Sequence, residues 1–465
     1  MKKIKPRIYL LMENKKRELD ARIYFALKAS LSNFSIVIGR KSNIFDNRKR
    51  MQKGIVIFKS LGPRNLKEIL EYKRLGFIIG AIDEEGMNFF TPKEYIERVH
   101  RPCIENIDIF FCWGEKDYNA IIDSFPMMSG KIYKTGNSRI DILKEPLNKK
   151  FFKKAEEIKK KEGDFILVNT MFSKANNYYL LKNGNQDYVE SLIADGYKPD
   201  SLKVKFAKSY MKFQQENLKN LKNFLTSYSI KKPNQKIIIR PHPAENSEMW
   251  IDFTRNKKNM KVVIDQINTC SWIIAAKKQI TSNCTTSVES YFLNRASTNY
   301  IVYQDEKVEF QLPKLMGINI RKDDDLIKYL NEKEERKIEF YNTMNLAKKS
   351  IHNINNQECS IKFLIDSLNA NEFVKTKINS FFLKDKFSGT FNSVFLNIYY
   401  YLRSFYRNLF TKQDKILSAM IMQKFPRLDA NEIQNTLNEY KSYLKIQEKI
   451  KLEQIYPQVF SIEQE

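Results

Sequence analysis

Short apolar runs that alternate with helical patterns constrain the fold of this 465-residue chain more than any other feature. Each run is continuous, which is typical of strands in a parallel sheet that is covered on both faces. The repeated strand–helix–strand order predicts a doubly wound α/β domain. In the first third, we expect strands at residues 7–12, 35–38, 54–58, 77–82, 107–112 and 131–134, and helices at residues 18–30 and 65–75.

A second series of the same kind follows Glu145-Pro146 and a lysine-rich helical stretch at 149–161. From about residue 333 the chain becomes polar and helical, and strand signals vanish. We therefore expect an α/β protein with two Rossmann-like domains facing a cleft, 1–147 and 148–332, and a helical C-terminal extension, 333–465. The expected strands of the second domain are residues 165–169, 237–239, 261–264, 272–275, 279–281 and 299–302, with a long helix at 201–228.

The formal net charge of the chain is +26. Such a charge attracts nucleic acid, an anionic membrane surface or anionic substrates. The Lys-, Asn- and Ile-rich composition of an AT-rich genome would also produce much of this excess. Because the basic residues are spread along the chain and form no familiar nucleic-acid-binding module, we expect no nucleic-acid partner.

The cysteines and the N-terminus indicate where the protein works. The five cysteines are odd in number and no pair has CxxC spacing, so we expect no disulfide framework, no metal site and a reducing compartment. The apolar run after the basic N-terminus is too short for a signal peptide. No stretch approaches the ~20 apolar residues of a membrane-spanning helix. We expect a cytoplasmic protein.

Residues 379–410 combine aromatic side chains with arginines at helical spacing. One interpretation is a helix packed on the protein core. The other is an interfacial helix that places its aromatic face among lipid headgroups and keeps Arg403 and Arg407 outside. The second interpretation predicts a peripheral association with an anionic membrane surface.

Three successive carboxylates, Asp83, Glu84 and Glu85, precede Gly86 directly after an expected strand. Ligands of open α/β sheets bind beyond the carboxyl ends of the strands. Mutual repulsion and partial burial are expected to raise the pKa of at least one of these acids, which suits a general base. The alternative is a solvated loop or helix start, where carboxylates are also favourable.

A stiff turn, Arg240-Pro241-His242-Pro243, follows another expected strand. The prolines restrict the backbone on both sides of His242, and Arg240 and His242 are both suitable phosphate donors. The alternative is a histidine that fills a turn. A hydroxyl-rich loop that leads into a helix start is a second candidate phosphate site; the alternative for it is helix capping alone. Its candidate ligands are Ser282, Asn283, Thr285, Thr286 and Ser287.

Charged residues also follow the first three expected strands. We expect Glu13, Arg17, Arg40, Lys41 and Lys59 to gather at neighbouring strand ends and to bind a carboxylated or phosphorylated acceptor. Each of them taken alone is typical of ordinary surface charge.

These residues together resemble a known group of enzymes. Glu84-Glu85-Gly86 and His242-Pro243 resemble the D/E-D/E-G and HP motifs of CMP-sugar-dependent bacterial sialyltransferases and Kdo transferases, and the 282–287 loop is similar to their third motif. The segments around Glu13, around Lys41 and from Thr135 to Asp141 resemble the bacterial surface-carbohydrate biosynthesis glycosyltransferases of GT-B type. The resemblance covers residues 7–310.

The resemblance implies a glycosyltransferase of capsule or lipopolysaccharide synthesis, working at the cytoplasmic face of the inner membrane. It implies transfer of a Kdo-like or sialic-acid-like sugar from a CMP-activated donor to a glycan or glycolipid, without a metal or a separate cofactor. By the same implication, His242 and the 282–287 loop hold the CMP phosphate, Glu289 contacts the ribose, and Glu85 or a neighbouring acid is the base, or the nucleophile of a retaining reaction.

Two other functions stay open on the residues alone. The first is a polyol-phosphate transferase that uses CDP-glycerol or CDP-ribitol, because His-Pro and Ser/Thr elements serve there too. The second is a non-catalytic basic protein that binds membranes or polyanions, with salt-sensitive affinity. A NAD-linked oxidoreductase is disfavoured because no GxGxxG follows any expected strand. A Mg²⁺-dependent transferase is also disfavoured, because the sequence has no obvious second acidic cluster to pair with Asp83–Glu85 around a metal ion.

Overall fold

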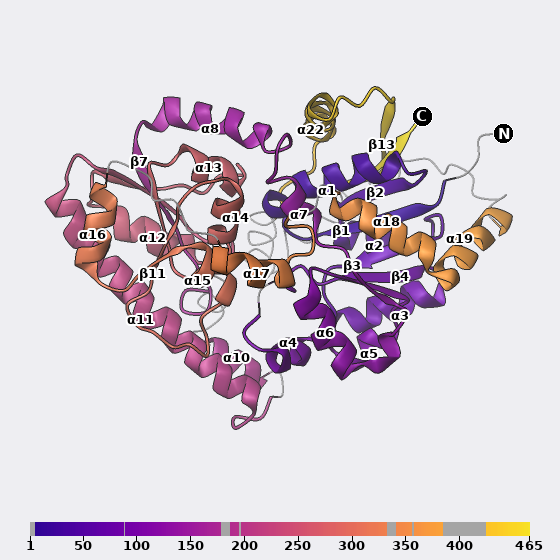
Figure 1. The fold of residues 1–465 in the computed structure, drawn as a ribbon, viewed down its shortest axis with the longest axis horizontal. Helices are drawn as coiled ribbons and strands as arrows, with labels where there is room; N and C mark the ends of the chain where they lie inside the picture. The colour runs from indigo at the N-terminus through magenta and orange to yellow at the C-terminus, as the bar shows by residue number, and fades with distance from the viewer. Residues whose placement is uncertain are drawn as a thin grey trace, which may run out of the picture. The chain divides into compact units, whose positions relative to one another are not determined.

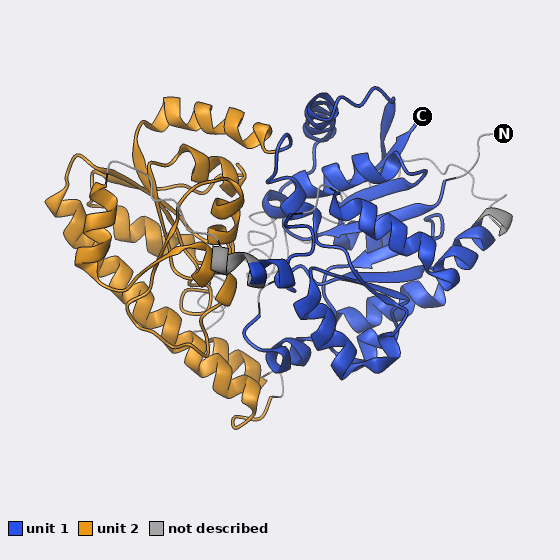
Figure 2. Cartoon of the chain, viewed as in Figure 1, with its two compact units in different colours: residues 1–147, 345–414, 424–465 blue, residues 148–344, 415–423 orange. Residues whose placement is uncertain are grey.

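The computed structural model describes residues 5–87, 89–177, 187–194, 197–332, 341–355, 358–384 and 425–465. Its chain divides into two compact units (Figure 2). Unit 1 consists of residues 1–147, 345–414 and 424–465, and unit 2 of residues 148–344 and 415–423. The chain therefore leaves unit 1 near Leu147 and later returns to it, so unit 1 is built from segments far apart in sequence.

Unit 1 contains an eight-stranded sheet with the order β13-β14-β2-β1-β3-β4-β5-β6 (Figure 1). The six strands from β2 to β6 in this order are parallel, so their carboxyl ends lie at one edge. The strands are β1 (Arg7–Met12), β2 (Ser35–Arg40), β3 (Gly54–Phe58), β4 (Ile78–Ile82), β5 (Ile109–Cys112), β6 (Ile132–Lys134), β13 (Ile450–Tyr456) and β14 (Val459–Gln464).

Helices cover the faces of this sheet. The central strands are buried along almost their whole length because both of their faces pack on helices. The helical elements are α1 (Lys15–Ser30), α2 (Lys41–Asn47), η1 (Pro63–Asn65), α3 (Leu66–Arg74), α4 (Pro92–Arg98), α5 (Arg101–Ile104), α6 (Glu115–Ser124), η2 (Pro126–Met128), α7 (Ser138–Asp141), α18 (Ser360–Ala370), α19 (Glu372–Lys384) and α22 (Ala430–Tyr443); α17 (Tyr341–Ser350) spans the division between the units.

Unit 2 contains a six-stranded parallel sheet with the order β12-β11-β10-β7-β8-β9. Its strands are β7 (Phe165–Asn169), β8 (Lys236–Arg240), β9 (Met260–Val262), β10 (Lys278–Thr281), β11 (Thr298–Tyr300) and β12 (Ile318–Ile320). Its helices are α8 (Lys149–Glu162), α10 (Tyr188–Ala194), α11 (Leu202–Lys231), α12 (Ser247–Thr254), α13 (Thr269–Ala275), α14 (Thr286–Phe292), α15 (Gln311–Met316) and α16 (Asp323–Asn331). The expectation of an α/β protein with two parallel sheets is thus confirmed.

Three expectations about individual elements need correction. Residues 272–275 are not a strand, because they form the end of α13, whose Asn268 cap accepts from the Cys270 N–H. The strand β12 had no counterpart among the expected strands. The last residues form strands as well: β14 pairs antiparallel with β2, and β13 pairs with β14.

The C-terminal region is otherwise helical, as expected, through α17, α18, α19 and α22. The edge strand β13 was missed because its first residues alternate between apolar and charged side chains, and β14 because its apolar run is interrupted by Ser461. Gly39 of β2 permits the hairpin to approach, since a Cβ there would lie 2.7 Å from the Gln458 carbonyl oxygen. The segment at 379–410, for which a core helix and an interfacial helix were both open, lies mostly outside the described residues.

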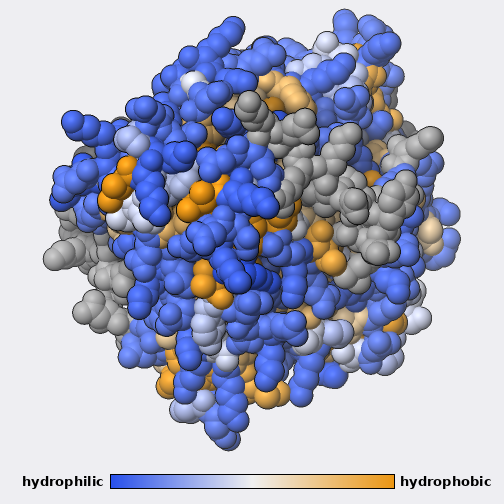
Figure 3. Space-filling view, turned by 60° about the vertical axis from the view of Figure 1, so that its left-hand side comes forward, coloured by the Kyte–Doolittle hydropathy of each residue, from blue (hydrophilic) through white to orange (hydrophobic). Residues whose placement is uncertain are grey.

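One face of the protein is predominantly polar. Figure 3 shows a face covered mainly by hydrophilic side chains, with hydrophobic side chains in small separate groups. Across the described ranges, no helix has both the length and the apolar character needed to cross a bilayer.

Candidate functional sites in the two units

The acidic turn after β4 is rigidly held. The Trp113 indole N–H donates to the Asp83 carbonyl oxygen at 2.6 Å, and the Gly86 N–H donates to the same oxygen at 3.0 Å. The Asp83 carboxylate accepts the Glu85 N–H at 3.0 Å. A Cβ at position 86 would lie 3.1 Å from both the Asp83 oxygen and the Trp113 ring, so glycine suits this close turn. The three acids therefore have fixed and different surroundings.

Glu84 is the buried member of the acidic turn. Its Oε1 lies 2.5 Å from Arg22 Nη2, and its Oε2 lies 3.7 Å from Arg139 Nη1. The side chains of Glu84 and Arg22 are 10% and 5% exposed. Burial acts to raise the pKa of Glu84, but the positive charges of Arg22 and Arg139 outweigh burial and lower this pKa. Glu84 is thus an ionised partner of two arginines.

Glu85 is 49% exposed and pairs with Arg17 at 2.8 Å. Desolvation acts to raise the pKa of Glu85, but the charge and hydrogen bond of Arg17, supported by two further arginines, lower this pKa to about 2. Water screens part of this effect because the side chain is half exposed. Burial raises the pKa of Asp83, so Asp83 is the member of the turn that shows the expected upward shift.

The basic residues of the first strand ends do gather, but together with carboxylates. Lys59 Nζ lies 2.6 Å from Glu18 and 3.2 Å from Glu13. Lys41 Nζ lies 3.2 Å from Glu68 and 3.6 Å from Glu13. This edge is therefore a network of ion pairs, and its positive charges are largely compensated within the protein, unlike the cationic pocket that the sequence predicts.

Arg40 belongs to the same edge through its backbone. It is the last residue of β2, and its N–H donates to the Gln458 carbonyl oxygen at 3.3 Å. The C-terminal hairpin thus adjoins the edge that carries Lys41 and Lys59.

Several residues of this network were missed by the sequence analysis: Glu18, Arg22, Glu68, Arg98 and Arg139. Glu18 belonged to the charged stretch after the first expected strand but was given no role, and Arg22 was interpreted only as part of a helix. The spacing of four residues between Glu18 and Arg22 places both on one face of α1, and this was the available signal. Arg98 and Arg139 lie on short helices whose approach to the acidic turn depends on the tertiary fold.

In unit 2, the His-Pro turn is organised around the buried carboxylate of Glu245, which is 0% exposed. The His242 N–H donates to Thr170 Oγ1 at 3.1 Å, and the Thr170 hydroxyl donates to Glu245 Oε1 at 2.7 Å. The same carboxylate accepts from the Phe172 N–H and from the Trp250 indole, each at 2.8 Å. Glu245 thus ties the carboxyl ends of β7 and β8 together and positions His242.

The imidazole of His242 has a defined orientation. The Ala244 N–H donates to His242 Nδ1 at 3.2 Å, so the neutral ring carries its proton on Nε2. The half-buried ring follows β8 at the carboxyl edge. The structure therefore makes Nε2 a hydrogen-bond donor, as the phosphate hypothesis requires.

Arg240 has more internal contacts than the sequence suggests. Its guanidinium donates to Asp265 at 2.7 Å and to the Ile267 carbonyl oxygen at 3.0 Å, and it lies over the Trp272 ring. Burial lowers the pKa of Arg240, although Asp265 opposes this shift. Arg240 Nε, by contrast, is buried and has no hydrogen-bond partner. Arg240 Nε is therefore the buried nitrogen of this side chain that is available for a phosphate-binding role.

The hydroxyl-rich loop after β10 is partly structural. Ser287 donates to Asn299 Oδ1 at 3.0 Å, and Ser282 donates to the Tyr300 carbonyl oxygen at 3.3 Å. Asn283 has a φ of +56° and both donates to and accepts from the Phe310 backbone. These three side chains fix the loop conformation through internal hydrogen bonds.

The start of α14 lacks the side-chain cap that the capping alternative predicts. Thr285 is the N-cap residue, and no side chain caps the helix. Thr286 Oγ1 is buried and has no hydrogen-bond partner. Glu289 is half-buried on the first turn, close enough to Arg240 for their charges to interact.

Asn169 adds a residue that the sequence analysis missed. It ends β7 beside Arg240 of β8 in the strand register. Its Nδ2 is buried and has no hydrogen-bond partner, as is true of Arg240 Nε. Buried polar atoms are normally paired, so this concentration of unpaired groups at one sheet edge indicates a ligand site. The only available signal was a polar residue at the end of an apolar strand.

Among the described residues, no group of three or more His, Cys, Asp and Glu side chains has a geometry that could hold a metal ion. The carboxylates of Glu84 and Glu85 pair with arginines, and the Asp83 carboxylate accepts the Glu85 N–H.

Comparisons with known proteins identify no family. No family model matches the chain, and no curated protein matches it. Two similar solved structures are UDP-GlcNAc 2-epimerases, one from Methanocaldococcus jannaschii and one from Neisseria meningitidis. They are 14% and 13% identical to this chain, respectively, and each has a TM-score of 0.45. Each match covers 79% of this chain, and the matches cover 99% and 100% of the epimerase chains. The wall teichoic acid polymerase TagF has 11% identity over 81% of this chain and 89% of its own, with a TM-score of 0.44. Likeness of this degree carries no argument about substrate or reaction.

Proposed function

We propose that this protein is a glycosyltransferase of surface-polysaccharide synthesis that transfers an acidic, Kdo-like or sialic-acid-like sugar from a CMP-activated donor to a glycan or glycolipid. The nucleotide binds at the carboxyl edge of the unit 2 sheet, and the acceptor binds at the carboxyl edge of the unit 1 sheet. The net charge of +26 favours anionic substrates and an anionic membrane surface.

The observation that carries this proposal is the set of donors at the unit 2 edge. His242 Nε2 is a donor, and Arg240 Nε, Asn169 Nδ2 and Thr286 Oγ1 are buried polar atoms without hydrogen-bond partners. A nucleotide phosphate accepts several hydrogen bonds at once, and its charge grows when the sugar leaves. Donors that are already oriented by the fold stabilise that charge without reorganisation, which is the requirement for a leaving nucleotide.

The acidic turn supplies the second half of the chemistry. Glu85 is the exposed member and is ionised at neutral pH, so it can accept the proton of an acceptor hydroxyl. A pKa near 2 makes Glu85 a weak base while it is paired with Arg17. An anionic substrate that takes over the hydrogen bond of Arg17 would raise the pKa of Glu85 towards the range of an effective base.

The test is a nucleotide panel. CMP and CDP are added separately to the protein, and the shift in melting temperature is measured. We expect protection by CMP, and His242→Ala should reduce this protection about tenfold in apparent affinity, the loss typical of one charge-assisted hydrogen bond. His100→Ala, the same substitution in unit 1, is the matched control and should bind CMP as the original protein does.

Turnover then separates the candidate activities. CMP- and CDP-activated donors are incubated with the protein, with and without EDTA, and released nucleotide is measured. Release of CMP from an acidic-sugar donor, insensitive to EDTA and lost in Glu85→Gln, supports the proposal. Release from CDP-glycerol or CDP-ribitol alone would identify a polyol-phosphate transferase instead. Binding to any polyanion without release, unchanged in Glu85→Gln, would identify a non-catalytic protein.

A further inference from the structure

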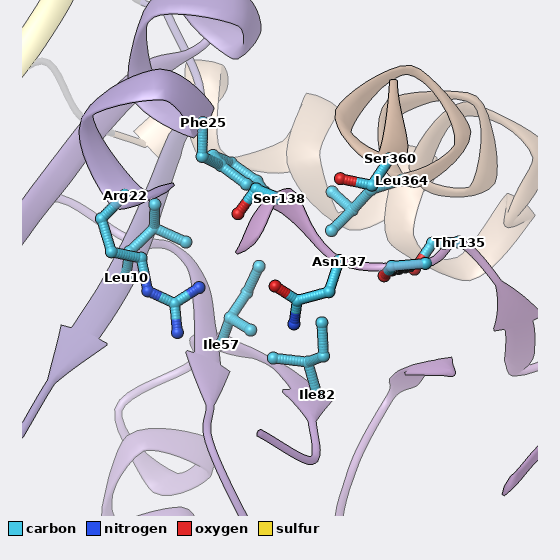
Figure 4. A pocket seen from close by; sticks show the side chains of 11 residues that line it. Leu10, Arg22, Phe25, Ile57, Ile82, Thr135, Asn137, Ser138, Ser360 and Leu364 are labelled. Atoms are coloured by element: carbon cyan, nitrogen blue, oxygen red, sulfur yellow. Dashed lines mark hydrogen bonds between the residues drawn. The ribbon is translucent and has the colours of Figure 1, made fainter. Parts of the chain in front are cut away.

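A small cavity lies at the carboxyl edge of the unit 1 sheet (Figure 4). Side chains from β1, β3, β4, α1 and α18 and from the turn before α7 form its walls. Its apolar walls include Leu10 and Ile57, and its polar wall is formed by Arg22 and the Thr135–Ser138 turn. Arg22 also pairs with Glu84, so the cavity adjoins the acidic turn directly.

Two buried donors in this cavity have no hydrogen-bond partner: Arg22 Nε and Asn137 Nδ2. The two residues are 5% and 2% exposed. Figure 4 shows both side chains directed into the cavity from different walls. A buried donor left unpaired is costly, and two of them around one space indicate an acceptor atom between them.

The fold holds both donors in place. Asn137 Oδ1 accepts the Arg139 N–H at 2.9 Å as the N-cap of α7, and this cap turns the amide nitrogen towards the cavity. The Asn137 backbone is clamped by Asn353, which accepts from its N–H at 3.2 Å and donates to its carbonyl oxygen at 3.1 Å. Arg22 is fixed by its contact with Glu84 at 2.5 Å. Such preset donors suit recognition of one particular group.

The size of the cavity limits its occupant. The cavity volume is about 10 Å³, which is the room that roughly one oxygen atom needs. The charge of Arg22 favours a negative oxygen, and one oxygen of a planar carboxylate enters such a slot more readily than a tetrahedral phosphate.

We propose that the Arg22–Asn137 cavity is a subsite for one carboxylate oxygen of an acidic sugar, which accepts hydrogen bonds from Arg22 Nε and Asn137 Nδ2. This inference rests on the proposed function, since it names the substrate group that unit 1 recognises. The carboxylate belongs either to the acceptor or to the donor sugar, and the experiment distinguishes these sources.

The test uses the methyl glycoside of N-acetylneuraminic acid as an acceptor-like probe, its methyl ester as a neutral match, and CMP-N-acetylneuraminate as a donor probe. Binding is measured by calorimetry on the full chain. Asn137→Ser keeps a capping oxygen but removes the donor, and Asn137→Asp replaces the donor with a charged acceptor. Asn33→Asp, on an exposed loop of unit 1, is the matched charge control.

We expect the acid to bind at least about tenfold more tightly than the ester, and Asn137→Ser to lose roughly that factor, with a larger loss in Asn137→Asp. Asn33→Asp should bind as the original protein does. A loss confined to the CMP-linked probe assigns the carboxylate to the donor, and a loss confined to the glycoside assigns it to the acceptor.

Three outcomes would overturn the subsite: equal binding of the acid and its ester, no binding of the glycoside or of the CMP-linked probe, or unchanged affinity in both Asn137 variants. Each would mean that the cavity holds only a water molecule. If an Asn137 variant does not fold, Arg22→Lys serves instead, because lysine can keep the pair with Glu84 but lacks Nε. CMP protection, measured in parallel, reports on unit 2 alone: its absence refutes the proposed function, while the acid–ester difference still decides the cavity.

Discussion

The carboxyl edges of the two parallel sheets have opposite chemistry. In unit 1 the edge is dense in ion pairs, such as Arg22 with Glu84, Arg17 with Glu85 and Lys59 with Glu18. In unit 2 the edge consists of hydroxyl and amide groups arranged around the buried carboxylate of Glu245, together with an ion pair between the buried Arg240 and Asp265. The same type of strand end thus supports a dense ion-pair network in one unit and a donor array with few ion pairs in the other.

This difference suggests that the two sheet edges bind their substrates in different ways. Ion pairs compensate charge until a substrate anion competes for a guanidinium, so the unit 1 edge should respond to pH and salt. The hydroxyl and amide donors of unit 2 are positioned by the buried carboxylate of Glu245 and need no exchange of ion pairs. Unit 2 should therefore respond mainly to loss of the contacts that position these donors. Single substitutions at the carboxyl edges of the two sheets test this difference.

The largest effect is expected from Arg22→Met in unit 1. This change leaves Glu84 buried without its closest cation, which should destabilise unit 1 by about 3 kcal/mol. Hydrogen exchange of the β4 amides is the measurement, because it reports on unit 1 specifically. Adding Glu84→Gln should restore part of the loss, and a double variant no more stable than Arg22→Met would argue that the ion pair is not the cause.

A smaller loss is expected from Glu245→Gln in unit 2. The amide nitrogen of glutamine would oppose one of the donors that the carboxylate now accepts, at a cost of about 2 kcal/mol. Exchange of the β8 amides should show this loss, and CMP protection should weaken with it. Glu248→Gln, on an exposed position nearby, is the control; a loss as large in this control would mean that Glu245 has no special role.

The smallest effect on stability, below about 1 kcal/mol, is expected from Arg17→Gln, because the pair with Glu85 is half exposed. The pKa of Glu85 should rise from about 2 towards its usual value, as followed by NMR of the labelled carboxyl group. Because this folded-state pKa is lowered, the pair stabilises the protein above pH about 4.5 and loses that effect as pH falls through about 2. An unchanged pKa would contradict the role of Arg17.

Much of the backbone could be predicted from local pattern. The central strands of both sheets are continuous apolar runs, and each was expected within a few residues of its bounds, as for β1 and β7. The predictions failed where local pattern is ambiguous. The short apolar segment at 272–275 is compatible with a helix or a strand, and the edge strand β13 lacks an apolar run.

The candidate sites were predictable only in part, for a related reason. Glu85 and His242 follow apolar strands, so their place at a sheet edge could be expected from the sequence. Arg22 and Asn137 could not be expected as partners, because an α1 face and a turn before α7 meet only in the fold. The facing of the two domains across a cleft stays a prediction.

Sequence by itself determined the two series of buried strands, because burial on both faces requires continuous apolar runs that any reader of the chain can see. It also determined which turns are stiff or acidic, since these are local. Only the tertiary structure decided which charges are compensated, which carboxylate keeps a raised pKa and which donors are left unpaired. Those properties depend on distances of a few ångströms between segments remote in sequence, and electrostatic and hydrogen-bond energies change steeply over such distances.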